Sequence, residues 1–308
     1  MKLLSSGLII NGDPYYSPKI SLCPFSFISR REFNQINKSG LDLIGDLLSG
    51  QKWSFVESGK YAISIILNEL SLDKDDEIWI ITSTGNRYVS KCVTDEIAKI
   101  CNWSMKKSDK TKAIYIIHEF GRDSRELVNE FAGLGIPIIE DAAYGLLTAL
   151  MANWTFGQAD YSIFSFPKAF EMQAGGILIG GRNHKEEIDS SLIQSVARSA
   201  TNWVVDYNDI SLVRQNNHKS LSQRIVEMGL SPSYTFNSKE VPGVFMFDVP
   251  ETINLNEMKI FFNSHGCEST VFYGRYAYMV PVHQNIGSEQ IDYFIDLLSS
   301  FISNANVT

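Results

Sequence analysis

A lysine with the surroundings of a reactive amine stands in the segment FSFPK at 164–168, and two glycines follow at 175–176. Aromatic neighbours exclude water from an amine, and desolvation lowers the pKa of a lysine so that its lone pair becomes free. A neutral amine is what a Schiff base with an aldehyde requires. The plainer interpretation is a surface lysine whose stem lies along apolar neighbours, and Lys168 taken alone does not exclude it.

Two acidic residues, Glu140 and Asp141, follow an apolar run at 136–139 and precede two alanines. Carboxylates are rarely fully buried unless they are paired. Successive side chains of a strand point to opposite faces, so we expect the two carboxylates to serve different purposes. A helix cap or a loop salt bridge explains the pair equally well when it stands alone.

A glycine turn, Ser58-Gly59-Lys60, opens a predicted helix. Backbone N–H groups at the start of a helix have no partner within it and can bind an anion. The segment lacks the GxxxxGK[ST] spacing of a P-loop, because Tyr61 follows the lysine. Most helix starts bind no ligand, so this feature is weak by itself.

The order of these three features is more specific than any one of them. An anion-binding helix start comes first, then a strand-end aspartate, then a strand-end lysine before two glycines. This order is the layout of an enzyme that uses pyridoxal phosphate (PLP). In such an enzyme the helix start holds the phosphate, the aspartate keeps the pyridine nitrogen protonated, and the lysine holds the aldehyde as an imine.

The segments that carry these residues predict an α/β domain. Residues 59–70 have the apolar periodicity of a helix, and Ser58 is placed to cap it. Apolar runs predict strands at 77–81, 113–117, 136–139 and 161–166, with helices near 88–100 and 123–134. Continuous apolar strands that alternate with helices indicate a mostly parallel sheet sandwiched by helices, whose ligands lie beyond the carboxyl ends of the strands.

After residue 181 the pattern changes and predicts a smaller α+β domain. Residues 183–235 are helical and polar, and a final helix is expected at 288–302. Strands are expected at 244–249, 269–273 and 276–280. We therefore predict a large domain at 1–205 and a small C-terminal domain at 206–308, with the first ~40 residues as candidates for packing on the small domain.

Composition narrows the class of protein. The 308 residues include 35 acidic and 27 basic side chains, and the net charge of −8 disfavours a nucleic-acid partner. The four cysteines have no zinc-site spacing and are expected to be free thiols, and the five histidines show no metal-ligand pattern. No segment reaches the length of a membrane span, and the first residues are too weak a pattern for a secretory signal. We expect a cytoplasmic protein without a metal.

Several ordered segments resemble the DegT/DnrJ/StrS family of sugar aminotransferases, which are PLP enzymes of fold type I. The family's VHxxG, IEDAA, FSF…K and GG elements are similar to IHEFG at 117–121, IEDAA at 139–143, FSFPK at 164–168 and the glycines at 175–176. Its phosphate helix, SGTxAL, is similar to SGKYAI at 58–63, and its C-terminal lPlH to VPVH at 280–283. The match covers residues 55–181 well and 270–300 loosely.

Carried over residue by residue, this resemblance implies the roles of the central residues. Lys168 would bind the cofactor and move the proton between substrate and cofactor carbons, and Asp141 would pair with the pyridinium. Ser165 would contact the phosphate together with the backbone N–H groups of Gly59 and Lys60, and Ser58 belongs to the same cofactor-binding segment. Tyr88 aligns with the aromatic residue that stacks on the pyridine ring, with a structural core tyrosine as the alternative.

Some positions depart from the family pattern. Lys168 lies three residues after Ser165, where the family has five. Tyr144 occupies the place of the Gln or His that helps to hold the cofactor ring. Asn208 is the nearest match to the segment that reaches the cofactor phosphate of the partner subunit.

Three more residues are candidates for contact with the substrate. His118 is expected in the strand-end layer near the cofactor, or equally as a structural histidine. Arg275 and His283 lie on a tyrosine-rich segment of the small domain. There the arginine could grip a carboxylate or a phosphate, with a surface ion pair as the alternative.

The resemblance implies an aminotransferase that moves an amino group from glutamate to a nucleotide-linked keto-sugar, for the amino sugars of a surface polysaccharide. It also implies a homodimer with shared active sites. The alternative is a catalytically inactive or regulatory PLP-fold protein, which the shortened lysine turn and Tyr144 motivate. A plain nucleotide-binding α/β protein comes last, because the chain has neither GxGxxG nor a P-loop.

Overall fold

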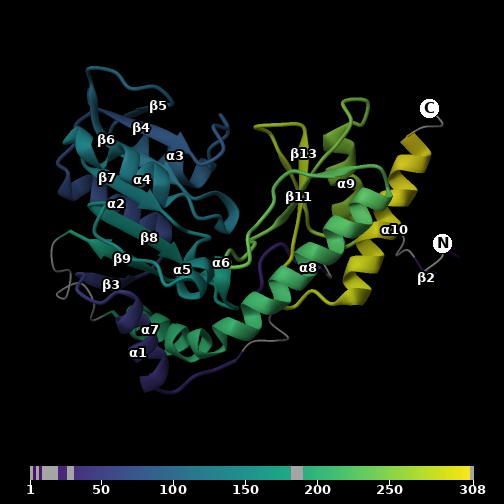
Figure 1. The fold of residues 1–308 in the computed structure, drawn as a ribbon, viewed down its shortest axis with the longest axis horizontal. Coiled ribbons are helices and arrows are strands. Elements are labelled where there is room, and N and C mark those ends of the chain that lie inside the picture. The colour runs from purple at the N-terminus through teal and green to yellow at the C-terminus, as the bar shows by residue number, and fades with distance from the viewer. Residues whose placement is uncertain (1–2, 5–6, 9–19, 26–30, 182–189, 306–308) are drawn as a thin grey trace. The chain divides into compact units, whose positions relative to one another are not determined.

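The computed structural model describes residues 3–4, 7–8, 20–25, 31–181 and 190–305, which form two compact units (Figure 1). The larger unit takes the described residues of Phe25–Asn208 together with Ser238–Val241. The smaller unit takes those of Met1–Pro24, Asp209–Asn237 and Pro242–Thr308. The chain passes from the larger to the smaller unit within the first turn of helix α8 (Tyr207–Glu227). The predicted helical residues at 183–189 lie outside the described residues.

The larger unit is built on a sheet with the strand order β3-β9-β8-β7-β6-β4-β5. Its strands are β3 (Trp53–Val56), β4 (Glu77–Thr82), β5 (Asn102–Ser104), β6 (Thr111–Ile117), β7 (Ile138–Asp141), β8 (Tyr161–Ser165) and β9 (Gly176–Gly180). Neighbours from β8 through to β5 are parallel, and β9 runs antiparallel to β8 and β3. The mostly parallel sheet predicted from the apolar runs is confirmed.

Helices cover both faces of this sheet, as the continuous apolar strands predict. Helices α2 (Gly59–Glu69) and α3 (Lys91–Ile97) share one buried cluster with strand residues such as Tyr115 and Ile139. Helix α4 (Arg125–Phe131) packs on the opposite face against Ile114 and Ile116. The other helical segments are α1 (Lys38–Leu47), η1 (Glu119–Gly121), η2 (Ala132–Leu134), α5 (Leu146–Ala152), α6 (Phe166–Ala169), α7 (Ser191–Trp203) and η4 (Val204–Asp206).

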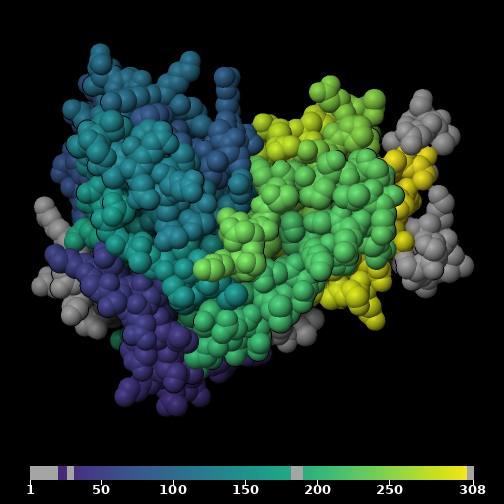
Figure 2. Space-filling model, in the orientation of Figure 1, coloured from purple at the N-terminus to yellow at the C-terminus, as the bar shows by residue number. Residues whose placement is uncertain are grey.

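Helix α1 lies on the surface of the larger unit and packs closely against α7 (Figures 1 and 2). A β-carbon at Gly40 would lie only 1.7 Å from the carbonyl oxygen of Thr201. The hydroxyl of Thr201 also accepts a hydrogen bond from the Asn37 N–H at 3.1 Å. Glycine at position 40 therefore permits an approach between the two helices that no side chain would allow.

The smaller unit is an antiparallel sheet with helices, as its sequence pattern predicts. Strands β10 (Ser231–Pro232), β11 (Phe245–Asp248), β13 (Ala277–Val280) and β12 (Thr270–Phe272) lie in this order. The apolar faces of α8, α9 (Leu255–Ser264) and α10 (Ser288–Ala305) share one aromatic-rich core with the sheet. Ile20 pairs with Cys267, and β1 (Leu3–Leu4) pairs with β2 (Gly7–Leu8).

Element boundaries differ from the prediction where turn chemistry decides them. The helix expected near 88–100 begins only at Lys91, because the preceding loop is held by its own contacts: Asn86 accepts from the Tyr88 N–H at 3.2 Å. Strand β7 begins at Ile138 and runs on to Asp141, so both acidic residues belong to the strand.

Candidate active site

Asp141 stands at the carboxyl end of β7 and is buried, with a side chain held at both oxygens. The Tyr115 hydroxyl donates to Oδ2 at 2.7 Å, and the Ala143 N–H donates to Oδ1 at 2.9 Å. Burial raises the pKa of Asp141, while the Tyr115 hydroxyl, the Ala143 N–H and the charges of His118 and Lys168 act in the opposite direction. The strand end therefore presents an oriented carboxylate in a site shielded from water.

Lys168 lies near this carboxylate despite the shortened turn before it. It belongs to the single helical turn α6, which follows β8 directly, and it is half-buried. Its Nζ lies 4.9 Å from the centre of the Tyr144 ring, within the range of a cation–π contact. The ring of Phe120 lies 5.9 Å from that of Tyr144. The structure thus brings together Lys168, Tyr144 and Asp141.

The start of helix α2 together with Ser165, called the cup, is where a phosphate is predicted to bind. Helix α2 begins at Gly59, and the Ser58 hydroxyl caps it by accepting from the Tyr61 N–H at 3.1 Å. Within the described part of the chain, no hydrogen bond takes the N–H groups of Gly59 and Lys60. A β-carbon built at Gly59 would lie 3.9 Å from Ser165 Oγ. Two backbone donors and one hydroxyl from separate elements therefore meet at the helix start, which suits a phosphate.

The side chain of Lys60 is directed elsewhere. Its Nζ lies 2.9 Å from Oε1 of Glu96 on helix α3, which also pairs with Lys99. Lys60 therefore contributes its backbone N–H to the cup, while its ammonium group ties α2 to α3.

The two glycines after the lysine allow β9 to lie close to the cup. Gly175 has φ +104°, and its N–H donates to the Glu57 carbonyl at 2.6 Å. A β-carbon on Gly176 would lie 2.3 Å from the Phe164 carbonyl oxygen and 3.4 Å from the Gly59 nitrogen. A side chain at Gly176 would therefore displace either β8 or the helix start that carries the backbone donors.

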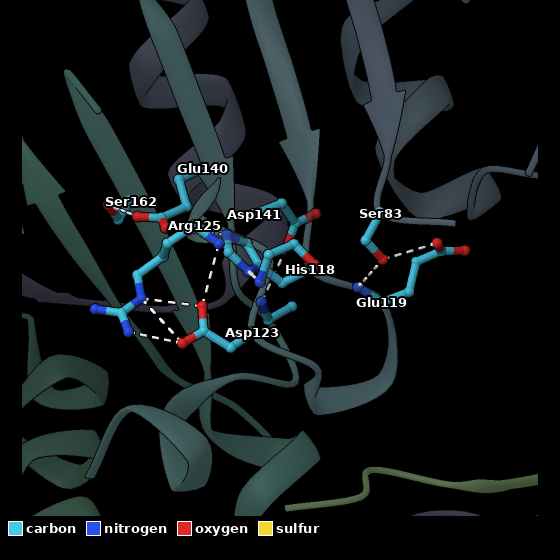
Figure 3. A network of polar contacts seen from close by, with 10 residues as sticks. Ser83, His118, Glu119, Asp123, Arg125, Glu140, Asp141 and Ser162 are labelled. Carbon is cyan, nitrogen blue, oxygen red and sulfur yellow. Dashed lines mark hydrogen bonds and ion pairs between the residues drawn. The ribbon is translucent and has the colours of Figure 1, made fainter. Parts of the chain in front are cut away.

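Glu140 serves the opposite face of the sheet, as strand alternation predicts (Figure 3). The Ser162 hydroxyl donates to Glu140 Oε2 at 2.5 Å, and His118 Nε2 lies 3.0 Å from Oε1 in an ion-pair arrangement. Burial raises the pKa of Glu140, but His118 and Ser162 outweigh this effect and hold it below its usual value. The Ser124 N–H donates to His118 Nδ1 at 3.0 Å.

His118 is therefore placed in a buried polar layer on the α4 face, with protein groups at both ring nitrogens. In the same layer, Arg125 forms paired hydrogen bonds to Asp123 and lies 4.7 Å from the centre of the Trp154 ring. These contacts favour the structural interpretation of His118, and a contact with the substrate stays a prediction.

Sequence reasoning missed two groups of residues at the strand ends. Tyr115 on β6 has the sequence pattern of a core aromatic residue, and no signal in the chain marks its hydroxyl as a partner of Asp141. Glu119 accepts from the Ser83 hydroxyl at 2.9 Å (Figure 3). It also accepts from both the N–H and the hydroxyl of Thr84, at 2.8 and 2.7 Å. Glu119 thereby fixes the loops after β4 and β6, and its position one residue past the IIH run is the only hint of this role.

Four further predicted residues lie elsewhere in the described part of the chain. Tyr88 precedes α3 and is 36% exposed, and Asn208 is exposed in the first turn of α8. In the smaller unit, Arg275 donates to Asp248 at 2.6 Å. There, His283 Nε2 lies 2.8 Å from the Ser21 carbonyl oxygen, and its Nδ1 accepts from the Asn285 N–H at 3.3 Å. The roles of these four residues stay predictions, and the surface ion pair considered for Arg275 is present.

Within the described residues, no group of histidine, cysteine, aspartate and glutamate side chains could hold a metal ion, and no helix is long and apolar enough to cross a membrane.

No family model and no curated protein sequence matches the chain. Solved structures do match. The aminotransferase TlmJ from Streptoalloteichus hindustanus has a TM-score of 0.69 at 12% identity, over 87% of this chain and 90% of TlmJ. The PLP form of Spr1654 from Streptococcus pneumoniae, described as a sugar aminotransferase, has a TM-score of 0.68 at 14% identity, over 94% of this chain and 100% of Spr1654.

A DegT DnrJ EryC1 StrS aminotransferase from Brucella abortus has a TM-score of 0.64 at 13% identity, over 88% of this chain and 91% of that protein. At such low identities a likeness of this kind establishes the fold and leaves the reaction to be argued from the site. The chain therefore has the fold type I architecture of the DegT-type aminotransferases that its sequence motifs resemble.

Proposed function

We propose that this protein is a PLP-dependent aminotransferase that moves an amino group from glutamate to a nucleotide-linked keto-sugar. The observation that carries the proposal is the meeting of a lysine, an oriented buried carboxylate and an anion cup at one edge of a parallel sheet. The aminotransferases among the matching solved structures support the same reaction class, and one of them is a PLP form. The keto-sugar, the glutamate donor and a cytoplasmic homodimer with shared active sites follow from the motif resemblance.

The residues of the site fit the cofactor. The unused N–H groups of Gly59 and Lys60, with the Ser165 hydroxyl, would hold its phosphate. The Asp141 carboxylate would pair with the protonated ring nitrogen, a contact that favours charge on both partners. When bound, PLP withdraws electrons from the carbon that loses or gains a proton.

The chain's own groups would do the remaining work. Lys168 would move a proton between the substrate carbon and a cofactor carbon, acting first as a general base and then as a general acid through one amine. The Tyr144 ring face, 4.9 Å from Nζ, would steady the lysine while it carries positive charge. Asp141 would stay ionised throughout, because two donors stabilise its charged form.

The test is the visible absorption spectrum of the purified protein with added PLP, compared with Lys168→Ala. We expect a cofactor band in the wild type that glutamate bleaches with release of 2-oxoglutarate, and no such response in the variant. Lys107→Ala, a change at an exposed lysine in the loop after β5, is the matched control and should behave like the wild type. A band that glutamate does not change would keep the cofactor and leave the amino donor open, whereas no band at all would refute PLP binding and favour the non-catalytic alternative.

A further inference from the structure

Tyr115 is a fully buried residue on β6 whose hydroxyl reaches the carboxylate of the proposed cofactor site. It is 0% exposed, and its oxygen lies 2.7 Å from Asp141 Oδ2. The parallel register of β6 and β7 pairs Tyr115 with Ile139 and Ile117 with Asp141. Tyr115 and Asp141 therefore lie on the same face of the sheet, two residues apart along the strand direction. The phenol thus approaches the carboxylate from the core side.

The hydrogen bond between Tyr115 and Asp141 lies in buried surroundings. The Tyr115 ring packs in the apolar cluster under α2 and α3, where a hydroxyl without a partner would be costly. Asp141 has one donor on each oxygen, Tyr115 on Oδ2 and the Ala143 N–H on Oδ1. One donor from within β6 and one from the turn after β7 fix the plane of the carboxylate. Of the two, only the Tyr115 bond depends on a side chain.

We propose that Tyr115 is a positioning residue for the cofactor, whose hydroxyl keeps the Asp141 carboxylate ionised and oriented toward the ring nitrogen. This inference rests on the proposed function and goes beyond the motif resemblance, which assigns no role to this position. Tyr115 does not touch the cofactor. It acts through Asp141, by stabilising the charged form of a carboxylate that burial would otherwise drive toward the neutral acid.

Removal of the hydroxyl has an effect with a definite sign. Tyr115→Phe keeps the ring and deletes one donor to a charged group. Burial already raises the pKa of Asp141, and loss of this donor raises it further. A hydrogen bond to a charged group corresponds to a shift of about one to two pH units in the carboxyl titration. PLP binding needs the ionised carboxylate, so on acidification it should be lost at a pH about one to two units higher in Tyr115→Phe than in the wild type. The pH range of this loss is called the acid limb.

The chain offers a matched control. Tyr278 in the smaller unit is also 0% exposed, and its hydroxyl lies 2.7 Å from Ser269 Oγ. Tyr278→Phe removes a buried hydroxyl with the same bond length but without a carboxylate partner. A general loss of stability should therefore be similar in the two variants, whereas the acid limb of cofactor binding should move only in Tyr115→Phe.

The experiment has two arms on the full-length chain. The first follows the carboxyl ¹³C NMR signal of Asp141, assigned by its absence in Asp141→Asn, against pH without cofactor. The second measures the affinity for added PLP against pH by absorbance. We expect the Asp141 midpoint and the acid limb of PLP binding to rise together, by about one unit or more, in Tyr115→Phe alone.

Each result decides between the possibilities. If the wild type binds PLP and Tyr115→Phe moves neither the midpoint nor the acid limb, the inference about Tyr115 is wrong and the proposed function stands. If the wild type does not bind PLP, the proposed function fails, and with it a cofactor role for Tyr115. If Tyr115→Phe does not fold, fluorotyrosine at position 115 replaces it. This stronger donor should lower the midpoint, and an unchanged midpoint would overturn the inference.

Discussion

Glu96 on α3 is the residue whose replacement should most clearly test how the phosphate cup is held. Its carboxylate receives Lys99 at 2.6 Å, Lys60 at 2.9 Å and the Ser64 hydroxyl at 2.9 Å. Lys60 and Ser64 belong to α2, whose first turn supplies the proposed phosphate donors. Glu96→Gln keeps the size of the side chain and removes the charge, so it should loosen α2 from α3 and weaken the cup.

The magnitude follows from the charge state. Hydrogen bonds from Lys99 and Lys60 hold the pKa of Glu96 at about 2, against 4.5 for a free glutamate. Without screening by water, this shift corresponds to about 3 kcal/mol of stability at neutral pH. The lysines that cover the carboxylate are themselves 52% and 62% exposed, so water screens both pairs. We therefore expect Glu96→Gln to cost about 1–2 kcal/mol.

The pH dependence gives this prediction its sign. Because the folded-state pKa is depressed, the contribution of Glu96 is fully present above pH 4.5 and disappears as the pH falls toward 2. The free energy of unfolding, from urea titrations at pH 7 and pH 3, should thus differ between wild type and Glu96→Gln more at pH 7. Glu130→Gln, at an exposed position of α4, should change little at either pH. Equal losses for Glu96→Gln at both pH values would refute the electrostatic reasoning.

Two further predictions concern aromatic contacts. Tyr144→Leu removes the ring face beside Lys168 and should weaken PLP binding about two- to fivefold. Tyr144→Phe keeps the ring and should bind PLP as the wild type does. Fluorescence titration measures both affinities, and equal weakening in the two variants would exclude the cation–π contact. Burial against Phe236 and Phe245 lowers the pKa of His218 from 6.5 to about 4. Because the unfolded state takes up the proton more readily, the stability that neutral His218 contributes is fully present above pH 6.5 and is lost as the pH falls toward 4. His218→Phe should reduce the acid-induced loss of unfolding free energy by about 1.4 kcal/mol per pH unit in that range, and urea titrations with an unchanged pH slope would contradict this.

The parts of the fold that the sequence predicts are those set by local pattern. The apolar runs of β6 and β8 stand out because both faces of their central residues are buried, and β4 is apolar on its half-buried face as well. The start of α2 is equally clear, since Ser58 caps it as predicted. Strand β3 escapes notice because it includes a serine and has no continuous apolar run, and β9 because it begins and ends at glycines, which are typical of turns.

Side-chain partnerships across the sheet could not be read from the chain. The sequence around Tyr115 is that of a core aromatic residue, and only the register of β6 and β7 shows that its hydroxyl lies beside Asp141. Lys60 looks like part of an anion site, but its ammonium group is taken by a carboxylate 36 residues later in the chain. Both contacts depend on strand or helix neighbours that are distant in sequence, which spacing rules do not specify.

The shortened turn before Lys168 is the clearest departure from the family pattern, and local geometry explains why it leaves the lysine in place. Phe166 and Phe170 stand four residues apart around the turn α6, and both rings are fully buried and stacked at 6.0 Å. Residues at this spacing share one side of a helical turn, so a residue midway between them points to the opposite side. Lys168 is that residue. The two phenylalanines anchor the turn in the core, and the lysine is thereby directed away from the core, toward Tyr144.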